Sequence, residues 1–226
     1  MDDGKKPIYE HVKELRYRLI SSIIIILVLS IISYFFYDLL LNFLVKPLGK
    51  ELIFLAPQDA FLFKFKVIIL TGFLFSFPAI LYHSCRFISS APDKKIKVSL
   101  LFISAVILFI ISLIFSYFVV LPVGLKFLLS FASDILKPEI TADKYFSFIF
   151  SLFLGPIIIF QMPLIIFSLN KMGIIRKKTL KENRKIAVLA IFIIAAIVTP
   201  PDAITMFLLA IPLIMIYEAS IILIKD

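Results

Sequence analysis

Residues 185–225 read KIAVLAIFIIAAIVTPPDAITMFLLAIPLIMIYEASIILIK and contain two apolar runs of unequal length. The first run, Ile186–Val198, would be only about 20 Å long as a helix. The hydrocarbon core of a bilayer is roughly 30 Å thick, so this run is too short to cross it unaided. The second run, Ala203–Ile224, is long enough. The stretch therefore predicts a membrane hairpin, residues 186–224, whose first leg is short.

The prolines and acids of this hairpin have structural explanations. Pro200 and Pro201 cannot continue the first helix, so the chain must turn there, and Asp202 is placed to cap the second helix. Pro212 and Glu218 lie within the second leg. Glu218 is close enough to the membrane surface to stay hydrated, which favours a packing or surface role at least as much as a binding site.

The composition indicates a multispanning helical membrane protein. The chain is 62% hydrophobic, with 25 Phe, and only 17% of its residues are charged. The charges fall in blocks between long apolar runs, whereas the strands of a membrane barrel alternate apolar and polar residues. The single cysteine excludes an intrachain disulfide and a thiolate metal cluster.

The apolar runs predict an all-α fold with six transmembrane helices in a single domain, residues 1–226. Residues 1–18 are expected to form an amphipathic helix at the membrane surface. Of the 24 Lys and Arg, 17 fall on the side of the two termini, which places both termini in the cytoplasm. Four spans are expected before the hairpin: Leu19–Leu41, Val67–Cys85, Val98–Leu121 and Tyr145–Leu169.

The usual constellations of catalytic and metal-binding residues are absent from the sequence. It contains no Gly-x-Ser-x-Gly elbow, no His-Glu-x-x-His and no glycine loop for phosphate. His11 and His83 lie in different segments and are expected to be interfacial side chains. The basic residues flank spans, so positive-inside bias explains them better than nucleic acid does. We expect no enzymatic activity, no cofactor and no metal.

Polar groups inside the spans remain as candidates for function, because they are unfavourable in lipid. Gln161 lies in the fourth span and would either contact a substrate or form an interhelical hydrogen bond. Pro78, Pro163 and Pro212 permit broken helices of the kind found in small secondary transporters and channels. No internal repeat is visible, so a transporter or channel is the alternative function rather than the leading one.

Several motifs make the chain resemble the TatC family, the multispanning subunit of the Sec-independent twin-arginine protein translocase. They occur in the family's order and cover nearly the whole chain. The matching segments are Glu10–Leu19 (EHVKELRYRL), Phe77–Tyr82 (FPAILY), Ser116–Pro122 (SYFVVLP), Thr199–Asp202 (TPPD) and Leu209–Pro212 (LAIP) continuing to Tyr217-Glu218.

The resemblance implies a receptor in the cytoplasmic membrane that binds signal peptides with paired arginines. It implies export of folded proteins by an oligomeric complex with single-span TatA and TatB subunits, driven by the proton-motive force. Glu14 and Arg16 match the family's functional Glu-Leu-Arg. Glu14 would pair a guanidinium, a geometry that favours Arg over Lys. Without the resemblance, a solvated charge on an interfacial helix would be the simpler interpretation of Glu14.

The sequence departs from the family at two places. The first cytoplasmic loop usually carries Phe, a Pro-containing turn and then Glu; here Phe87 is kept, but Asp93 is the only acid. Glu14, Arg16, Phe87 and Asp93 are thus the predicted peptide-binding residues. The family's polar position in the fourth span is commonly Glu; here Gln161 is expected to contact a partner helix without carrying a charge. A relative with a degenerate receptor loop is a further alternative.

Overall fold

The computed structural model describes residues 8–89, 97–131, 139–199 and 202–224, and these are helical except for short connections. One isolated parallel bridge joins Ile53 to Thr141. The helices are α1 (Ile8–Phe35), α2 (Tyr37–Val45), η1 (Lys46–Leu48), α3 (Pro57–Ser89), α4 (Val98–Phe115), η2 (Ser116–Val120), α5 (Leu121–Leu129), α6 (Ala142–Phe160), α7 (Met162–Lys171), α8 (Lys177–Glu182), α9 (Arg184–Val198) and α10 (Ala203–Leu223).

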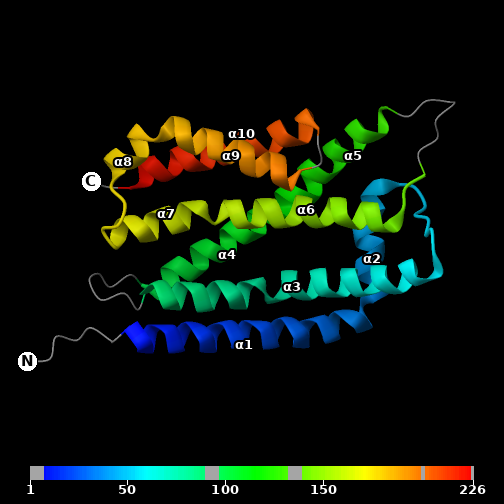
Figure 1. Ribbon diagram of the computed structural model, residues 1–226, viewed down its shortest axis with the longest axis horizontal. Helices are drawn as coiled ribbons and strands as arrows, with labels where there is room; N and C mark the ends of the chain where they lie inside the picture. Colours follow the sequence, from blue (N-terminus) through cyan, green and yellow to red (C-terminus); the bar gives the residue numbers. More distant parts are fainter. Residues whose placement is uncertain (1–7, 90–96, 132–138, 200–201, 225–226) are drawn as a thin grey trace, which may run out of the picture.

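The long helices run roughly parallel to one axis, while α4 and α5 cross them obliquely and α2 lies across the bundle (Figure 1). The start of α1 and the end of α10 lie at the same end of the molecule, together with the end of α3, the start of α4 and the end of α7. We call this the terminal end, and the opposite end, which holds α2, the far end. Helix α1 packs on α3, α3 on α4 and α6, and α9 on α10.

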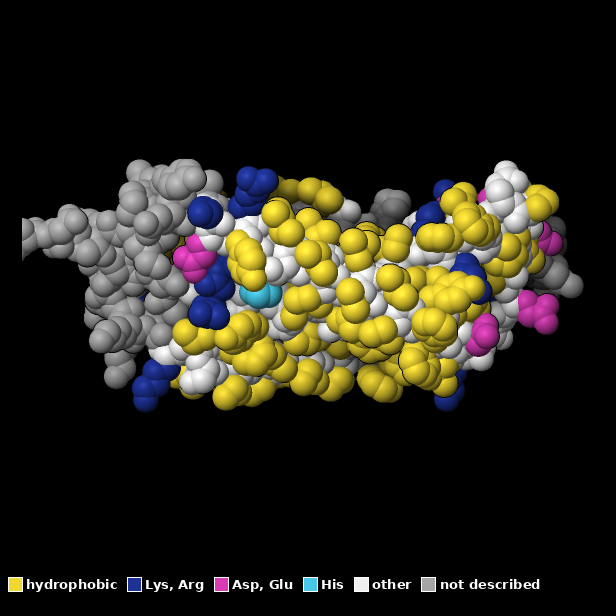
Figure 2. Space-filling view, turned by 90° about the horizontal axis from the view of Figure 1, so that it is seen from below, with side chains coloured by type: hydrophobic (Ala, Val, Ile, Leu, Met, Phe, Trp, Pro, Cys, Tyr) yellow, Lys and Arg dark blue, Asp and Glu magenta, His cyan; other side chains and the backbone are white. Residues whose placement is uncertain are grey.

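Five helical stretches of the described residues are long and apolar enough to cross a membrane. Helix α9 is not among them: its 15 residues span about 22 Å, in agreement with a short first hairpin leg. On the face seen in Figure 2, hydrophobic side chains form a band between charged residues at the two ends. The five stretches are Arg16–Phe35, Pro57–Phe87, Val98–Leu129, Ala142–Lys171 and Ala203–Ile222.

The core is centred on α6 rather than shared evenly among the helices. In the most apolar part of the α6–α7 stretch 56% of the residues are buried, against 11% for α1. Burial of α6 rests on large side chains such as Ile149, Leu152 and Ile157, each at most 2% exposed. Helix α1 is therefore peripheral, and most of its apolar surface is left for lipid.

The N-terminal segment differs from expectation. The sequence predicts a separate surface helix before the first span, but α1 continues without interruption from Ile8 to Phe35. No proline or glycine interrupts residues 8–35, so the helical hydrogen-bond ladder has no reason to break there. Helix α3 begins at Pro57, because Pro suits the first helical position. The turn before it is held by Asp59 Oδ2, which accepts a hydrogen bond from the Ala56 N–H at 3.0 Å.

The third and fourth predicted spans are each interrupted. The π-helical turn η2 joins α4 to α5, so the helical path extends to Leu129, beyond the predicted end at Leu121. The fourth span divides at Gln161, where α6 ends and α7 begins with Pro163 in its first turn. Pro78 and Pro212, by contrast, lie inside continuous helices, α3 and α10.

The second hairpin leg begins at the cap predicted from the sequence. Asp202 is the N-cap of α10: its Oδ1 accepts a hydrogen bond from the Thr205 N–H at 2.7 Å. The Thr205 hydroxyl donates to Oδ2 of the same carboxylate. The cap satisfies a helix N–H that would otherwise have no partner, and the prediction for Asp202 is confirmed. Pro200 and Pro201 lie outside the described residues.

Replacing the cap should weaken the hairpin measurably. We expect Asp202→Ala to lower the free energy of unfolding in detergent by about 1 kcal/mol, because the first turn of α10 loses its side-chain acceptor. Asp202→Asn keeps an acceptor oxygen and should lose much less. Chemical or thermal unfolding followed by circular dichroism makes the comparison, and equal losses in the two variants would contradict the capping role.

Candidate functional site

Glu14 lies beside Arg18 on α1, near the terminal end. The guanidinium holds a single carboxylate oxygen in two ways: Nε donates to Glu14 Oε1 at 3.2 Å, and Nη2 also donates to it. The two residues are four apart, the spacing that places side chains on one helix face. The Arg18 side chain is 11% exposed and that of Glu14 is 24% exposed. Partial burial strengthens this pair relative to one in open solvent.

Arg18 also ties α1 to α3. Its Nη1 donates to the backbone carbonyl of His83 on the neighbouring helix α3 at 3.1 Å. Within α3, the hydrogen-bond donor to the His83 carbonyl would be the N–H of residue 87, in the last turn of the helix. Arg18 therefore orients the Glu14 carboxylate against α3 while holding the two helices together.

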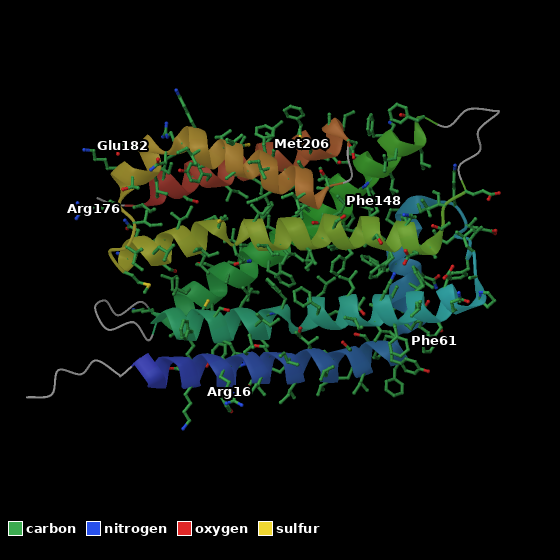
Figure 3. The ribbon with its side chains drawn as sticks, in the orientation of Figure 1. Arg16, Phe61, Phe148, Arg176, Glu182 and Met206 are labelled. Atoms are coloured by element: carbon green, nitrogen blue, oxygen red, sulfur yellow. The ribbon has the colours of Figure 1, made fainter. Side chains whose placement is uncertain are left out.

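The structure brings together only part of the predicted peptide-binding set. Phe87 is half-buried and lies one turn beyond His83 on α3; because α1 and α3 are antiparallel, it falls at the level of Glu14. Arg16 is exposed and points away from the bundle (Figure 3). Residues two apart on a helix do not share a face, so Arg16 and Glu14 cannot act as one unit. Asp93 lies outside the described residues.

Three carboxylates of the terminal end are engaged with bases. Glu14 pairs with Arg18, Glu182 lies 3.8 Å from Lys178, and Glu218 lies 2.9 Å from Arg184. The Glu182 and Glu218 pairs are well exposed, with side chains 63% and 36% accessible, so each contributes little to stability. Glu14 is the most buried of the three.

Gln161 lies at the junction of α6 and α7 and is only 7% exposed. Its Nε2 donates to the backbone carbonyl of Ala105 on α4 at 3.2 Å. Its Oε1 is buried and has no hydrogen-bond partner among the described residues. Of the two alternatives left open by the sequence, the interhelical hydrogen bond is the one present here, and the side chain is buried within the bundle.

The remaining predicted residues have structural partners. Glu218 joins α10 to α9 through Arg184, and the neighbouring Tyr217 hydroxyl donates to the Leu180 carbonyl of α8 at 2.9 Å. These bonds fasten the hairpin at the terminal end. Pro78 contributes to an apolar hollow of about 360 Å³ between α3 and α4. Among the described residues no group of three His, Cys, Asp or Glu could hold a metal ion.

The chain matches a protein family described as Sec-independent protein translocase protein (TatC) over residues 10–212. The chain belongs to the TatC family. The TatC of Carboxydothermus hydrogenoformans is 36% identical over 231 residues, covering 100% of this chain and 95% of that protein. The TatC of Aquifex aeolicus is 38% identical over 227 residues, covering 96% and 94%. A crystal structure of the twin-arginine translocase receptor TatC in DDM has a TM-score of 0.86 and 37% identity, covering 96% of this chain and 100% of that chain.

Family membership confirms the resemblance and decides against the small transporter or channel. The chain is a Sec-independent translocase subunit with several membrane-spanning helices, not a small transporter or channel. TatC is a translocase family and not a known enzyme family.

Sequence reasoning missed Arg18 and the His83 carbonyl as neighbours of Glu14 in this TatC chain. The spacing of four between Glu14 and Arg18 on one helix was a usable signal. The His83 carbonyl could not be found in this way, because it depends on how α3 crosses α1.

Proposed function

We propose that this TatC chain recognises signal peptides with paired arginines at the Glu14 carboxylate and helps export folded proteins across the cytoplasmic membrane. The single observation that carries the proposal is the hold of Arg18 on Glu14 through both Nε and Nη2. The Glu14 carboxylate already accepts two N–H groups of one guanidinium. It therefore has the position and partial burial needed to accept the guanidinium of a peptide arginine. The related structure described as a twin-arginine translocase receptor supports the receptor function of the chain, and the choice of Glu14 rests on the contacts given above.

The ligand must compete with Arg18 in this arrangement. A peptide guanidinium reaches Glu14 by displacing Arg18 from Oε1 or by joining it at the same carboxylate. Phe87 at the same level supplies an apolar surface for the residues that follow the arginines. Asp93 is proposed as the second carboxylate in place of the family's loop glutamate, and Arg16, turned away from Glu14, as a contact with the membrane surface or with the rest of the peptide.

The topology that fits this function has six spans, one domain and both termini in the cytoplasm. The excess of Lys and Arg on the side of the termini, 17 of 24, supports that orientation. The short α9 would be the fifth span and α10 the sixth. Transport would draw on the proton-motive force, without an enzymatic activity of the chain itself, and the complex would contain single-span TatA and TatB subunits.

Gln161 is proposed to meet such a partner helix through its Oε1, which accepts no hydrogen bond from the described part of the chain. The contact requires α4 and α7 to part, because the side chain is 7% exposed in the isolated chain. A photo-reactive amino acid at position 161 should cross-link to a single-span subunit only in the assembled complex. Position 158, which is 58% exposed on the same helix, serves as the comparison for cross-links made simply through exposure.

The receptor function is tested by direct binding. The full-length protein in detergent is titrated with a twin-arginine signal peptide and with a twin-lysine peptide of otherwise identical sequence. We expect about tenfold or greater preference for arginine, because only the guanidinium makes two parallel hydrogen bonds to a carboxylate. The Asp93→Ala variant is titrated in parallel. Weaker binding of the twin-arginine peptide would assign Asp93 as the second carboxylate, and unchanged binding would remove it from the site. Equal binding of both peptides by folded protein would favour the relative with a degenerate receptor loop.

A further inference from the structure

A groove of about 800 Å³ opens between α4, α7 and α10 at the terminal end. This volume lies within the range of about 300–1,000 Å³ that is typical of ligand sites. The groove is separate from Glu14, which lies on α1 against α3. Its apolar walls include Leu101, Leu108, Leu164, Phe167, Ile216 and Ala219.

Two lysines line this largely apolar groove, whose other polar lining residues are Ser104 and Ser220. Lys97 immediately precedes α4 and Lys171 is the last residue of α7, so both mark the terminal end of the groove. Neither belongs to any ion pair found among the described residues. The Lys171 Nζ instead lies 5.7 Å from the centre of the Phe167 ring, above the groove wall. The site thus combines a cationic mouth with an apolar body.

The length of the groove matches one leaflet of a bilayer. Its lining on α4 runs from Lys97 to Leu108, about 16 Å along a helix. That is roughly half of the 30 Å hydrocarbon core. A crossing partner helix would need contacts through the full thickness, whereas the acyl chains of a lipid occupy a single leaflet. The lysines lie where the headgroups of that leaflet would be, and long basic side chains reach toward such an interface.

We propose that this groove binds an anionic phospholipid, with the phosphate between Lys97 and Lys171 and the acyl chains against the walls formed by α4, α7 and α10. Basic pockets between transmembrane helices on the cytoplasmic side are known to take such headgroups. The lipid fills a space between three helices that the described part of the chain leaves open. Its binding does not depend on the recognition of signal peptides at Glu14.

Native mass spectrometry of the full-length protein in detergent tests the charge requirement. The probes are phosphatidylglycerol and phosphatidylcholine with identical acyl chains, each titrated separately. We expect one retained phosphatidylglycerol and weaker retention of phosphatidylcholine. The Lys97→Gln, Lys171→Gln double variant should bind phosphatidylglycerol about 25-fold more weakly, at about fivefold for each lysine. A matched variant, Lys181→Gln with Lys185→Gln, removes two exposed charges of the same end outside the groove and should bind normally.

A second variant tests the apolar part without changing any charge. Ala219 is exposed and lines the groove, so Ala219→Leu places three carbon atoms in it and should reduce phosphatidylglycerol retention while leaving thermal unfolding unchanged. Equal retention of both lipids, equal losses in the two lysine double variants, or no effect of Ala219→Leu would each overturn the proposal. So would unchanged lipid binding in all variants together with a cross-link from position 219 to a signal peptide, which would make the groove a peptide site.

Discussion

Glu14→Gln should reduce the affinity for a twin-arginine signal peptide by about 30-fold or more, and should abolish the preference for arginine over lysine. Losing one partner of a hydrogen-bonded, partly buried charge pair is worth about 2–5 kcal/mol, and about 1.4 kcal/mol corresponds to a factor of ten. The Glu14 side chain is 24% exposed, so solvent screening places the effect at the lower end of that range. Isothermal titration in detergent measures both quantities.

Two controls separate ligand binding from folding. In Glu14→Gln alone, Arg18 keeps the His83 carbonyl but loses its carboxylate, so the protein itself is less stable. The double variant Glu14→Gln, Arg18→Gln leaves no unpaired charge and should recover part of the lost stability, short of the hydrogen bond to His83, without recovering peptide affinity. Glu182→Gln, which alters an exposed pair at the same end, should bind the peptide normally. Affinity close to that of the unmodified protein in the double variant would contradict the role of Glu14 as the arginine acceptor.

Gly72→Ala should be among the most destabilising single substitutions in the chain. A Cβ at Gly72 would lie 2.6 Å from the Cα and 2.7 Å from the backbone nitrogen of Ser30 on α1. Backbone atoms cannot rotate out of the way, so α1 must move off α3. We expect a loss of about 3 kcal/mol in the free energy of unfolding, at the upper end of overpacking effects. Thermal and denaturant unfolding in detergent check this value.

The matched control is Ser30 on α1, which faces Gly72 where α1 and α3 cross. Ser30→Ala keeps the Cβ and removes a buried Oγ that has no hydrogen-bond partner among the described residues, so it should be neutral or slightly stabilising. Because α1 carries Glu14, Gly72→Ala should also weaken signal-peptide binding at temperatures where the protein is still folded. A stable Gly72→Ala protein with normal peptide affinity would show that the close crossing of α1 and α3 does not position the site.

Local signals account for the parts of the fold that sequence reasoning predicted correctly. The cap at Asp202 needs only the residues that follow it, and the short first hairpin leg is a matter of counting apolar residues between Lys185 and Thr199. The interruptions were harder to place. Pro78 and Pro212 are accommodated inside helices, whereas the junction falls at Gln161, because packing against neighbouring helices decides whether a proline ends a helix or is tolerated within it.

The sequence by itself determined that this chain is an all-helical membrane protein of the TatC family, since run lengths, charge blocks and motifs are properties of the chain alone. Only the tertiary structure decided what its polar groups contact. The approach of α3 to α1 gives Arg18 a backbone acceptor beside Glu14, and the approach of α4 to α6 turns Gln161 inward to Ala105. Lys97 and Lys171 share a groove although 74 residues separate them in the sequence. Such contacts follow from helix packing angles, which depend on all the side chains at each crossing and are not encoded in any single segment.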